Sequence, residues 1–100
     1  MASRVKWTRP AIEDLNRNAA FIANDSVFYA KKVSVEIYQR AEKLKEFPRQ
    51  GRKIILESSD RELREVNAYS WRVIYEIVEN EVFVLKVIHM AQSFEPKNLV

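Results

Sequence analysis

The sequence contains no cysteine and a single glycine, Gly51. Without cysteine there is no disulfide, no thiol nucleophile and no zinc finger. One glycine also rules out a glycine-rich phosphate loop and the GxGxxG fingerprint of dinucleotide-binding folds. No apolar run approaches the roughly 20 residues of a membrane-spanning helix, and the first ten residues, MASRVKWTRP, lack the apolar segment of a secretory signal. We therefore expect a cytoplasmic protein that does not associate with membranes.

The size and charge of the chain set broad limits on what it can be. One hundred residues correspond to one domain, so we expect residues 1–100 to form a single unit. The hydrophobic fraction of 47% is typical of a globular protein rather than a disordered one. The net charge of +3 is compatible with RNA, DNA or an acidic protein partner, and equally with an ordinary surface.

The first half of the chain predicts one strand followed by two helices. Val5–Thr8 has strand character, and Thr8 can cap a helix that holds Pro10 in its first turn. A polar turn at residues 24–26 separates this helix from a second one over Val27–Phe47, with a cap at one of the last two turn residues. Apolar residues at helical spacing are Ile12, Leu15, Ala19 and Ile22 in the first helix, and Ala30, Val33, Ile37, Ala41 and Leu44 in the second. The short connection predicts an antiparallel helical hairpin.

The second half of the chain predicts strands. Lys53–Glu57 and Arg61–Val66 are the first two, and a bulge in the latter would bring Leu63 and Val66 to one face. Tyr69–Gln92 then reads as two long strands around a two-residue turn at Asn80-Glu81. The fold class is therefore α+β: an N-terminal strand and an antiparallel helical hairpin packed on a mainly antiparallel sheet of four to five strands.

Arg72 and His89 are the first candidate site. A turn at Asn80-Glu81 would place them opposite each other on one face of the ribbon, whereas a three-residue loop would put them on opposite faces. A guanidinium suits phosphate oxygens, and a histidine can transfer a proton near neutral pH. In the structural alternative Arg72 pairs with Glu76 or Glu57, and His89 is a hydrogen-bonded packing residue. Side-chain chemistry alone favours the structural alternative, because no protein nucleophile is identifiable.

A tract of basic residues is the second candidate site. It spans the end of the second helix, the following loop and the next strands, and comprises Lys45, Arg49, Arg52, Lys53, Arg61 and Arg64. Such a tract could bind the phosphates of a nucleic acid. The alternative is a solvated helix end, where the helix dipole favours cations. Glu42 and Glu46 dilute the tract, so the alternative is slightly favoured.

A strand, a helical hairpin that ends in the first of four motifs, and the three further motifs that follow it in order resemble the RelE/ParE superfamily of type II toxins. The four motifs are LKEFPRQGR (Leu44–Arg52), RELREV (Arg61–Val66), YSWRVIYEI (Tyr69–Ile77) and VLKVIHMAQ (Val84–Gln92). The resemblance covers roughly Val5 to Gln92. It implies a toxin that a cognate antitoxin wraps and neutralises in the cytoplasm, at a groove where the helices meet the sheet. It further implies that the toxin reaches operator DNA only through the antitoxin, and that it uses no metal or other cofactor.

The superfamily has two branches with different activities. RelE/YoeB-like members cut mRNA in the ribosome with the RNA 2′-hydroxyl as nucleophile, whereas ParE-like members poison DNA gyrase. In a nuclease, Arg72 would match the arginine that stabilises the phosphate, His89 the general acid and Glu57, more weakly, the base. Ala91 and Gln92 stand where a further arginine is expected, and the pattern FPxxGR with a final HxxQ is similar to ParE-type chains.

The resemblance therefore favours a ParE-like gyrase poison that is not an enzyme. A metal-independent, ribosome-dependent mRNA endonuclease is the alternative. A regulatory homologue without toxicity, which binds only its antitoxin and operator, is a third possibility.

Overall fold

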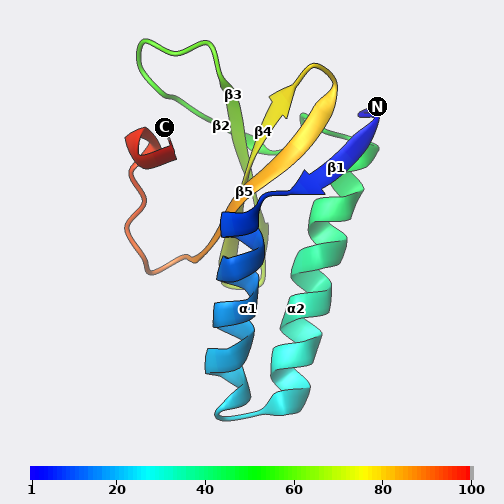
Figure 1. The fold of residues 1–100 in the computed structure, drawn as a ribbon, viewed down its shortest axis with the longest axis vertical. Helices are drawn as coiled ribbons and strands as arrows, with labels where there is room; N and C mark the ends of the chain where they lie inside the picture. The colour runs from blue at the N-terminus through cyan, green and yellow to red at the C-terminus, as the bar shows by residue number, and fades with distance from the viewer. Residues whose placement is uncertain (100) are drawn as a thin grey trace.

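The computed structural model describes residues 1–99 and has the predicted α+β architecture (Figure 1). Its elements are β1 (Arg4–Trp7), α1 (Arg9–Ala23), α2 (Val27–Glu42), the 3-10 helix η1 (Lys43–Lys45), β2 (Arg52–Ile54), β3 (Glu62–Ala68), β4 (Trp71–Val78), β5 (Glu81–His89) and the 3-10 helix η2 (Pro96–Leu99). The predicted second helix thus changes to 3-10 geometry after Glu42. None of the helices within residues 1–99 combines the length and the apolar character that crossing a bilayer requires.

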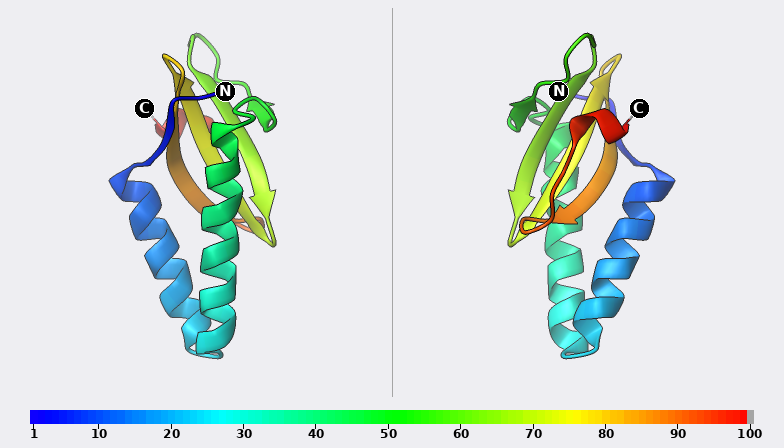
Figure 2. Two further views of the ribbon diagram at one scale, coloured as in Figure 1. Left: turned by 90° about the vertical axis from the view of Figure 1, so that its right-hand side faces the viewer. Right: turned by 90° about the vertical axis from the view of Figure 1, so that its left-hand side faces the viewer.

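One five-stranded sheet forms the centre of the molecule, with strand order β1-β5-β4-β3-β2. β1 runs parallel to β5, and all other neighbours are antiparallel. Both long helices cover one face of the sheet, and the C-terminal segment with η2 lies against the opposite face (Figure 2). We call these the inner face and the outer face.

Side chains cap both long helices, and one of these caps also joins its helix to the sheet. Thr8 Oγ1 accepts a hydrogen bond from the Ala11 amide at 3.4 Å and donates one to the Val84 carbonyl at 2.8 Å. Thr8 therefore begins α1 and, at the same time, holds the end of β1 against β5. Ser26 caps α2 by accepting from the Tyr29 amide at 3.0 Å. Both caps agree with the sequence-based prediction.

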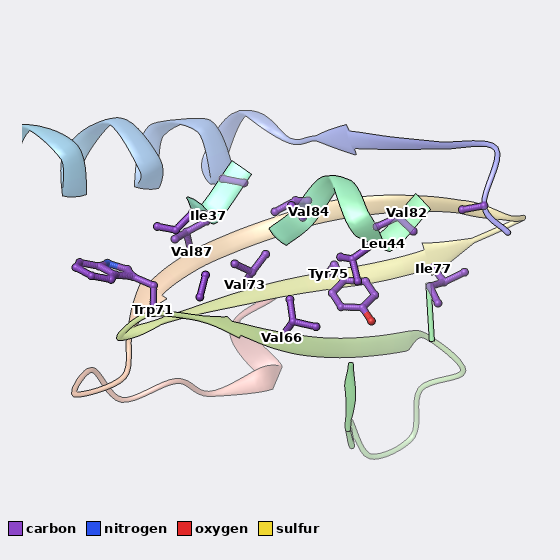
Figure 3. Close-up of a cluster of buried hydrophobic side chains, with 14 of the residues drawn as sticks. Ile37, Leu44, Val66, Trp71, Val73, Tyr75, Ile77, Val82, Val84 and Val87 are labelled. Atoms are coloured by element: carbon purple, nitrogen blue, oxygen red, sulfur yellow. The ribbon is translucent and has the colours of Figure 1, made fainter. Parts of the chain in front are cut away.

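The inner face carries the main apolar core. Every α2 position of the predicted stripe is buried, and Ile37 and Leu44 are completely enclosed. They pack on side chains from β3, β4 and β5, including Val66, Val73, Tyr75, Val82, Val84 and Val87 (Figure 3). On α1 Ile12 belongs to the predicted apolar stripe, but its side chain is 45% exposed. Ala11 and Asp14 are buried instead, because α1 turns this side toward β5.

The register of the β4–β5 hairpin differs from the prediction at two places. The turn is Glu79-Asn80, with φ values of 47° and 67°, so Val78 pairs with Glu81. Positive φ at both central residues is the geometry of a type I′ turn. A bulge then adds Leu85 to β5, because Tyr75 pairs with Val84 but Ile74 pairs with Lys86. The predicted turn at Asn80-Glu81 is therefore wrong.

The β2 and β3 strands also depart from the prediction. β2 covers only Arg52–Ile54, and β3 pairs with β4 without interruption from Glu62 to Ala68. The bulge predicted in β3 is absent because Leu63 and Val66 are buried on opposite faces of the sheet, Val66 in the inner core and Leu63 on the outer side. Both faces of this sheet therefore bury apolar side chains.

Candidate functional site

Arg72 lies on the outer face of β4, where a glutamate and an aromatic ring hold its side chain. Its Nε and Nη2 atoms lie 2.8 and 2.6 Å from Oε2 of Glu65, and its side chain is 22% exposed. The guanidinium carbon also lies 5.3 Å from the centroid of the Phe94 ring, within cation–π range. Arg72 thus forms an ion pair, as the structural alternative expected, but its partner is Glu65 rather than Glu76 or Glu57.

His89 ends β5 and packs against the edge of a tryptophan. Its ring centroid lies 5.1 Å from that of Trp71, with an interplanar angle of 87°. Nδ1 accepts a hydrogen bond from the Ala91 amide at 3.1 Å, and the His89 amide donates to Oε1 of Gln92 at 2.9 Å. These contacts and the tryptophan edge hold His89 at the end of β5.

The prediction that Arg72 and His89 face each other is wrong. Arg72 pairs with Ile88, while His89 pairs with Trp71. Directly opposed residues share a face of the sheet, and consecutive residues alternate between faces. Trp71 belongs to the inner core, so His89 lies on the inner side and Arg72 points to the outer face. The bulge at Leu85 causes this separation, because it shifts the pairing by one residue, whereas the changed turn shifts it by two and leaves the faces as predicted.

Glu57 lies far along the strand direction from Arg72. It is exposed, in the turn of the loop that joins β2 to β3. β3 begins at Glu62, whereas Arg72 pairs with Asn67. Five residues of strand separate these two β3 positions by about 16 Å, at roughly 3.3 Å per residue. The structure therefore does not bring Arg72, His89 and Glu57 together.

The arginines of the basic tract are paired with glutamates. Oε2 and Oε1 of Glu62 accept from Arg49 at 2.9 and 3.0 Å, and Oε2 also accepts from Arg64 at 3.1 Å. Hydrogen bonding from Arg49, with a smaller contribution from Arg64, holds the pKa of Glu62 below its usual value. The remaining pairs are Arg52 with Glu65 at 3.0 Å and Arg61 with Glu76 at 2.9 and 3.0 Å.

Lys45 and Lys53 are the members of the tract that form no ion pair within residues 1–99. Both are exposed. Lys53 lines a hollow of about 440 Å³ beneath the β2–β3 loop, where Asp60 and Glu62 lie among the basic side chains. Binding of nucleic acid by the tract stays a prediction. Within the same residues, no group of three potential metal ligands lies close enough together to hold an ion.

The sequence analysis missed a buried tyrosine that joins two of the motifs. Tyr75 Oη donates to the Pro48 carbonyl at 2.6 Å and accepts from the Gly51 amide at 3.0 Å. Burial raises the pKa of the Tyr75 hydroxyl. A Cβ atom on Gly51 would lie only 2.5 Å from Tyr75 Oη and 2.7 Å from the Glu65 carbonyl oxygen. The proline and glycine of FPRQGR and the second tyrosine of YSWRVIYEI thus form one packing unit, and their joint occurrence was the available signal.

Asp14 was also missed. It is 5% exposed, and its Oδ2 accepts from the Val87 amide at 3.0 Å. β1 pairs with β5 only as far as Val84, so this amide lies beyond the end of the β1 ladder. Arg17 and Lys86 approach the same carboxylate at 3.2 and 3.6 Å. Asp14 therefore fixes α1 to the uncovered part of β5, and its position next to the apolar residues of α1 was the only clue.

An antiparallel helix pair on this five-stranded sheet is the architecture of the RelE/ParE superfamily of type II toxins. The family model described as the ParE toxin of the type II toxin–antitoxin system, parDE, matches residues 5–94. The chain therefore belongs to the ParE toxin family, and it is a type II toxin–antitoxin toxin, as the resemblance predicted.

Solved structures of low sequence identity share the fold. The chromosomal ParDE TA system from P. aeruginosa contains a chain that is 18% identical, with a TM-score of 0.68, and the match covers 86% of this chain and 94% of that one. The toxin–antitoxin complex RelBE2 from Mycobacterium tuberculosis contains a chain that is 19% identical, with a TM-score of 0.61, covering 89% and 99%. No curated protein sequence matches the chain significantly.

Proposed function

We propose that this toxin inhibits growth by binding and poisoning DNA gyrase, as the ParE-like branch implies, and that it is not a nuclease. The observation that carries this proposal is the position of Arg72 and His89 on opposite faces of the sheet. A general acid must come within about 3 Å of the atom to which it gives its proton, next to the groups that bind the phosphate. Two side chains separated by the sheet cannot meet at one phosphate.

The surroundings of Arg72 also support a structural role. Glu65 neutralises its charge, and the Phe94 ring covers one side of the guanidinium. A phosphate would have to displace this carboxylate, which also binds Arg52. Breaking charge-assisted hydrogen bonds of this kind opposes anion binding. The match of residues 5–94 to the ParE toxin model supports the same branch.

We further infer that the toxin is neutralised by a cognate antitoxin, since both related structures are named as toxin–antitoxin systems. The chain offers an apolar hollow of about 450 Å³ where η1 meets the N-terminal strand region, lined by Met1, Phe47 and Pro48 among others. Phe47 is 65% exposed there. An apolar side chain of an antitoxin helix or strand would bury this surface, as in helix-in-groove recognition.

The test compares two activities of the purified toxin and of the variants Arg72→Gln and His89→Gln. We expect the wild type to block DNA supercoiling by gyrase, and both folded variants to keep that inhibition within about threefold, because neither residue touches a reacting atom. Cells that express the toxin alone should show a DNA damage response without new mRNA ends. Ribosome-dependent mRNA cleavage that either variant abolishes, together with no effect on gyrase, would establish the endonuclease alternative and reject the proposal.

A further inference from the structure

The end of the helical hairpin exposes three large apolar side chains. Phe21 lies in the last turn of α1, and Val27 and Phe28 open α2; they are 76%, 72% and 79% exposed. We call these residues, with the turn at residues 24–26, the hairpin tip. Single exposed apolar residues are common on protein surfaces, but a cluster of them usually marks an interaction site. These three lie within eight positions, on either side of the turn that joins the two helices.

The exposed side chains of the hairpin tip do not belong to the apolar core. Both helices extend well beyond the edge of the sheet, so their connecting ends pack on no strand (Figures 1 and 2). The first buried residue of α2 is Ala30, and the buried residues of α1 lie in its first half, at Ala11 and Asp14. The exposure of Phe21 and Phe28 to water is unfavourable. Neither side chain belongs to the apolar core. These side chains are therefore available to contact another molecule.

The charges next to the hairpin tip are mainly positive. Lys31 and Lys32, one turn further along α2, are exposed and form no ion pair within residues 1–99. Arg17 on α1 is held by Asp14. A surface that accepts this region would be apolar at its centre and acidic around it, because complementary charges guide association and fix orientation.

The size of the patch distinguishes between possible occupants. Each aromatic side chain can bury about 150–250 Å², so the exposed parts of the three residues offer roughly 400 Å². A stable interface needs about 800 Å² per partner, so two tips facing each other are too small for a dimer. A lipid surface is also disfavoured, because the polar side chain of Asn24 and the charged side chain of Asp25 would enter it first. A recess on a partner protein that encloses the ends of both helices would bury more surface than contact with these three side chains alone.

We propose that the hairpin tip inserts into an apolar, acid-rimmed recess on the protein that the toxin poisons. This inference rests on the proposed function, under which that protein is gyrase. Phe21 and Phe28 would act as the buried anchors and Lys31 and Lys32 as the rim, in the arrangement typical of interface hot spots. The antitoxin would bind elsewhere, so that inhibition of the target and binding of the antitoxin can be separated by mutation.

The test is the double variant Phe21→Ser/Phe28→Ser, with Ile55→Ser as matched control. Ile55 is 76% exposed but lies in the β2–β3 loop, away from the hairpin. We expect the double variant to keep the Tm and the antitoxin affinity of the wild type while the concentration needed to inhibit supercoiling rises at least about tenfold. The control should inhibit like the wild type. Lys31→Glu/Lys32→Glu should weaken inhibition as well, and more at low salt than at high salt.

Several results would overturn the inference. The first is a double variant that inhibits gyrase as strongly as the wild type; a wild type without effect on gyrase would instead reject the proposed function itself. Loss of antitoxin binding in the double variant would assign the tip to the antitoxin. Conversion of a wild-type dimer to a monomer in sedimentation would assign it to a second copy. Flotation of the wild type, but not of the variant, with vesicles of anionic lipid would assign it to a membrane.

Discussion

The same sheet carries two different kinds of contact. One is the apolar core beneath the helices, and the other is the set of arginine–glutamate pairs along β2, β3 and β4. In the core, side chains such as Ile37 and Val73 have no exposed surface and contact only other apolar groups. Among the pairs, Glu65 holds both Arg52 and Arg72, with side chains between 12% and 68% exposed. The core supplies most of the folding energy, because buried area scales with stabilisation while exposed ion pairs contribute little. The pairs instead determine which arginines are free to bind a phosphate.

Tyr75 lies where these two regions meet. Its ring belongs to the core cluster, and its hydroxyl bonds the backbone of Pro48 and Gly51, next to Arg49. The loop that carries Arg49 toward Glu62 is therefore fixed from the core side. Three substitutions, taken from the core to the surface, test how far the two regions differ in stability.

Truncation in the core should have the largest effect. Ile37→Ala removes a side chain with no exposed surface, and we expect the free energy of unfolding to fall by about 2–5 kcal/mol, because a cavity remains. The Val35 side chain, on the same helix, is 45% exposed. Val35→Ala should therefore change the free energy of unfolding by less than about 0.5 kcal/mol. Urea denaturation of both variants provides the measurement. Equal losses would show that α2 is not packed on the sheet by the face described.

Removal of the Tyr75 hydroxyl should have an intermediate effect. Tyr75→Phe leaves the Pro48 carbonyl and the Gly51 amide without this partner in a buried site, which costs about 1–3 kcal/mol. Tyr38→Phe is the control, because the Tyr38 side chain is 50% exposed. Thermal unfolding should show a lower Tm only for the first variant. An unchanged Tm would mean that water replaces the tyrosine and that the loop is not fixed from the core.

The smallest effect should be the pH dependence that Glu62 contributes. Its pKa is lowered in the folded protein from the usual 4.5, so the unfolded chain binds more protons as the pH falls. The stabilisation by Glu62 is thus present above pH 4.5 and is lost as the pH falls through the lower, folded-state pKa. Glu62→Gln should be less stable than the wild type at pH 7, by under about 1 kcal/mol because Arg49 is 61% exposed.

Urea titrations at pH 7 and at pH 3 measure this difference, with Glu57→Gln as the control. Glu57 is exposed and forms no ion pair within residues 1–99. The difference in the free energy of unfolding between the wild type and Glu62→Gln should become smaller at pH 3. Glu57→Gln should be as stable as the wild type at both pH values. A difference that widens on acidification would contradict the lowered pKa.

Periodicity predicted the fold well and the site poorly, for physical reasons. The spacing of Ala30, Val33 and Ile37 identifies one helix face whatever surrounds it, and all three are buried. The register of β4 and β5 depends on two local backbone features instead. Glu79 adopts a positive φ although it is not a glycine, and Leu85 forms a bulge in an unbroken apolar run. Neither leaves a pattern in the sequence. The turn shifts the pairing by two residues, and the bulge shifts it back by one and so exchanges the faces.

The partners of the arginines were equally hidden. Arg72 is opposed by Asn67 on β3 and bonds Glu65 on the diagonal, because a long side chain reaches beyond its direct neighbour. Sequence spacing suggested Glu76 on the same strand, but that carboxylate is held by Arg61. Which glutamate an arginine binds depends on the positions of all the charged residues on the sheet, and the sequence of one strand does not reveal these positions.

The pairing of β1 with β5 has a consequence for the order in which the protein is made. Arg4 pairs with Glu81, 77 residues later, and Thr8 bonds the Val84 carbonyl. The N-terminal strand therefore has no place in the sheet until the residues of β5 have left the ribosome. Contacts of such long sequence separation form late and slow folding. The sheet can therefore be completed only after the last strand has been synthesised.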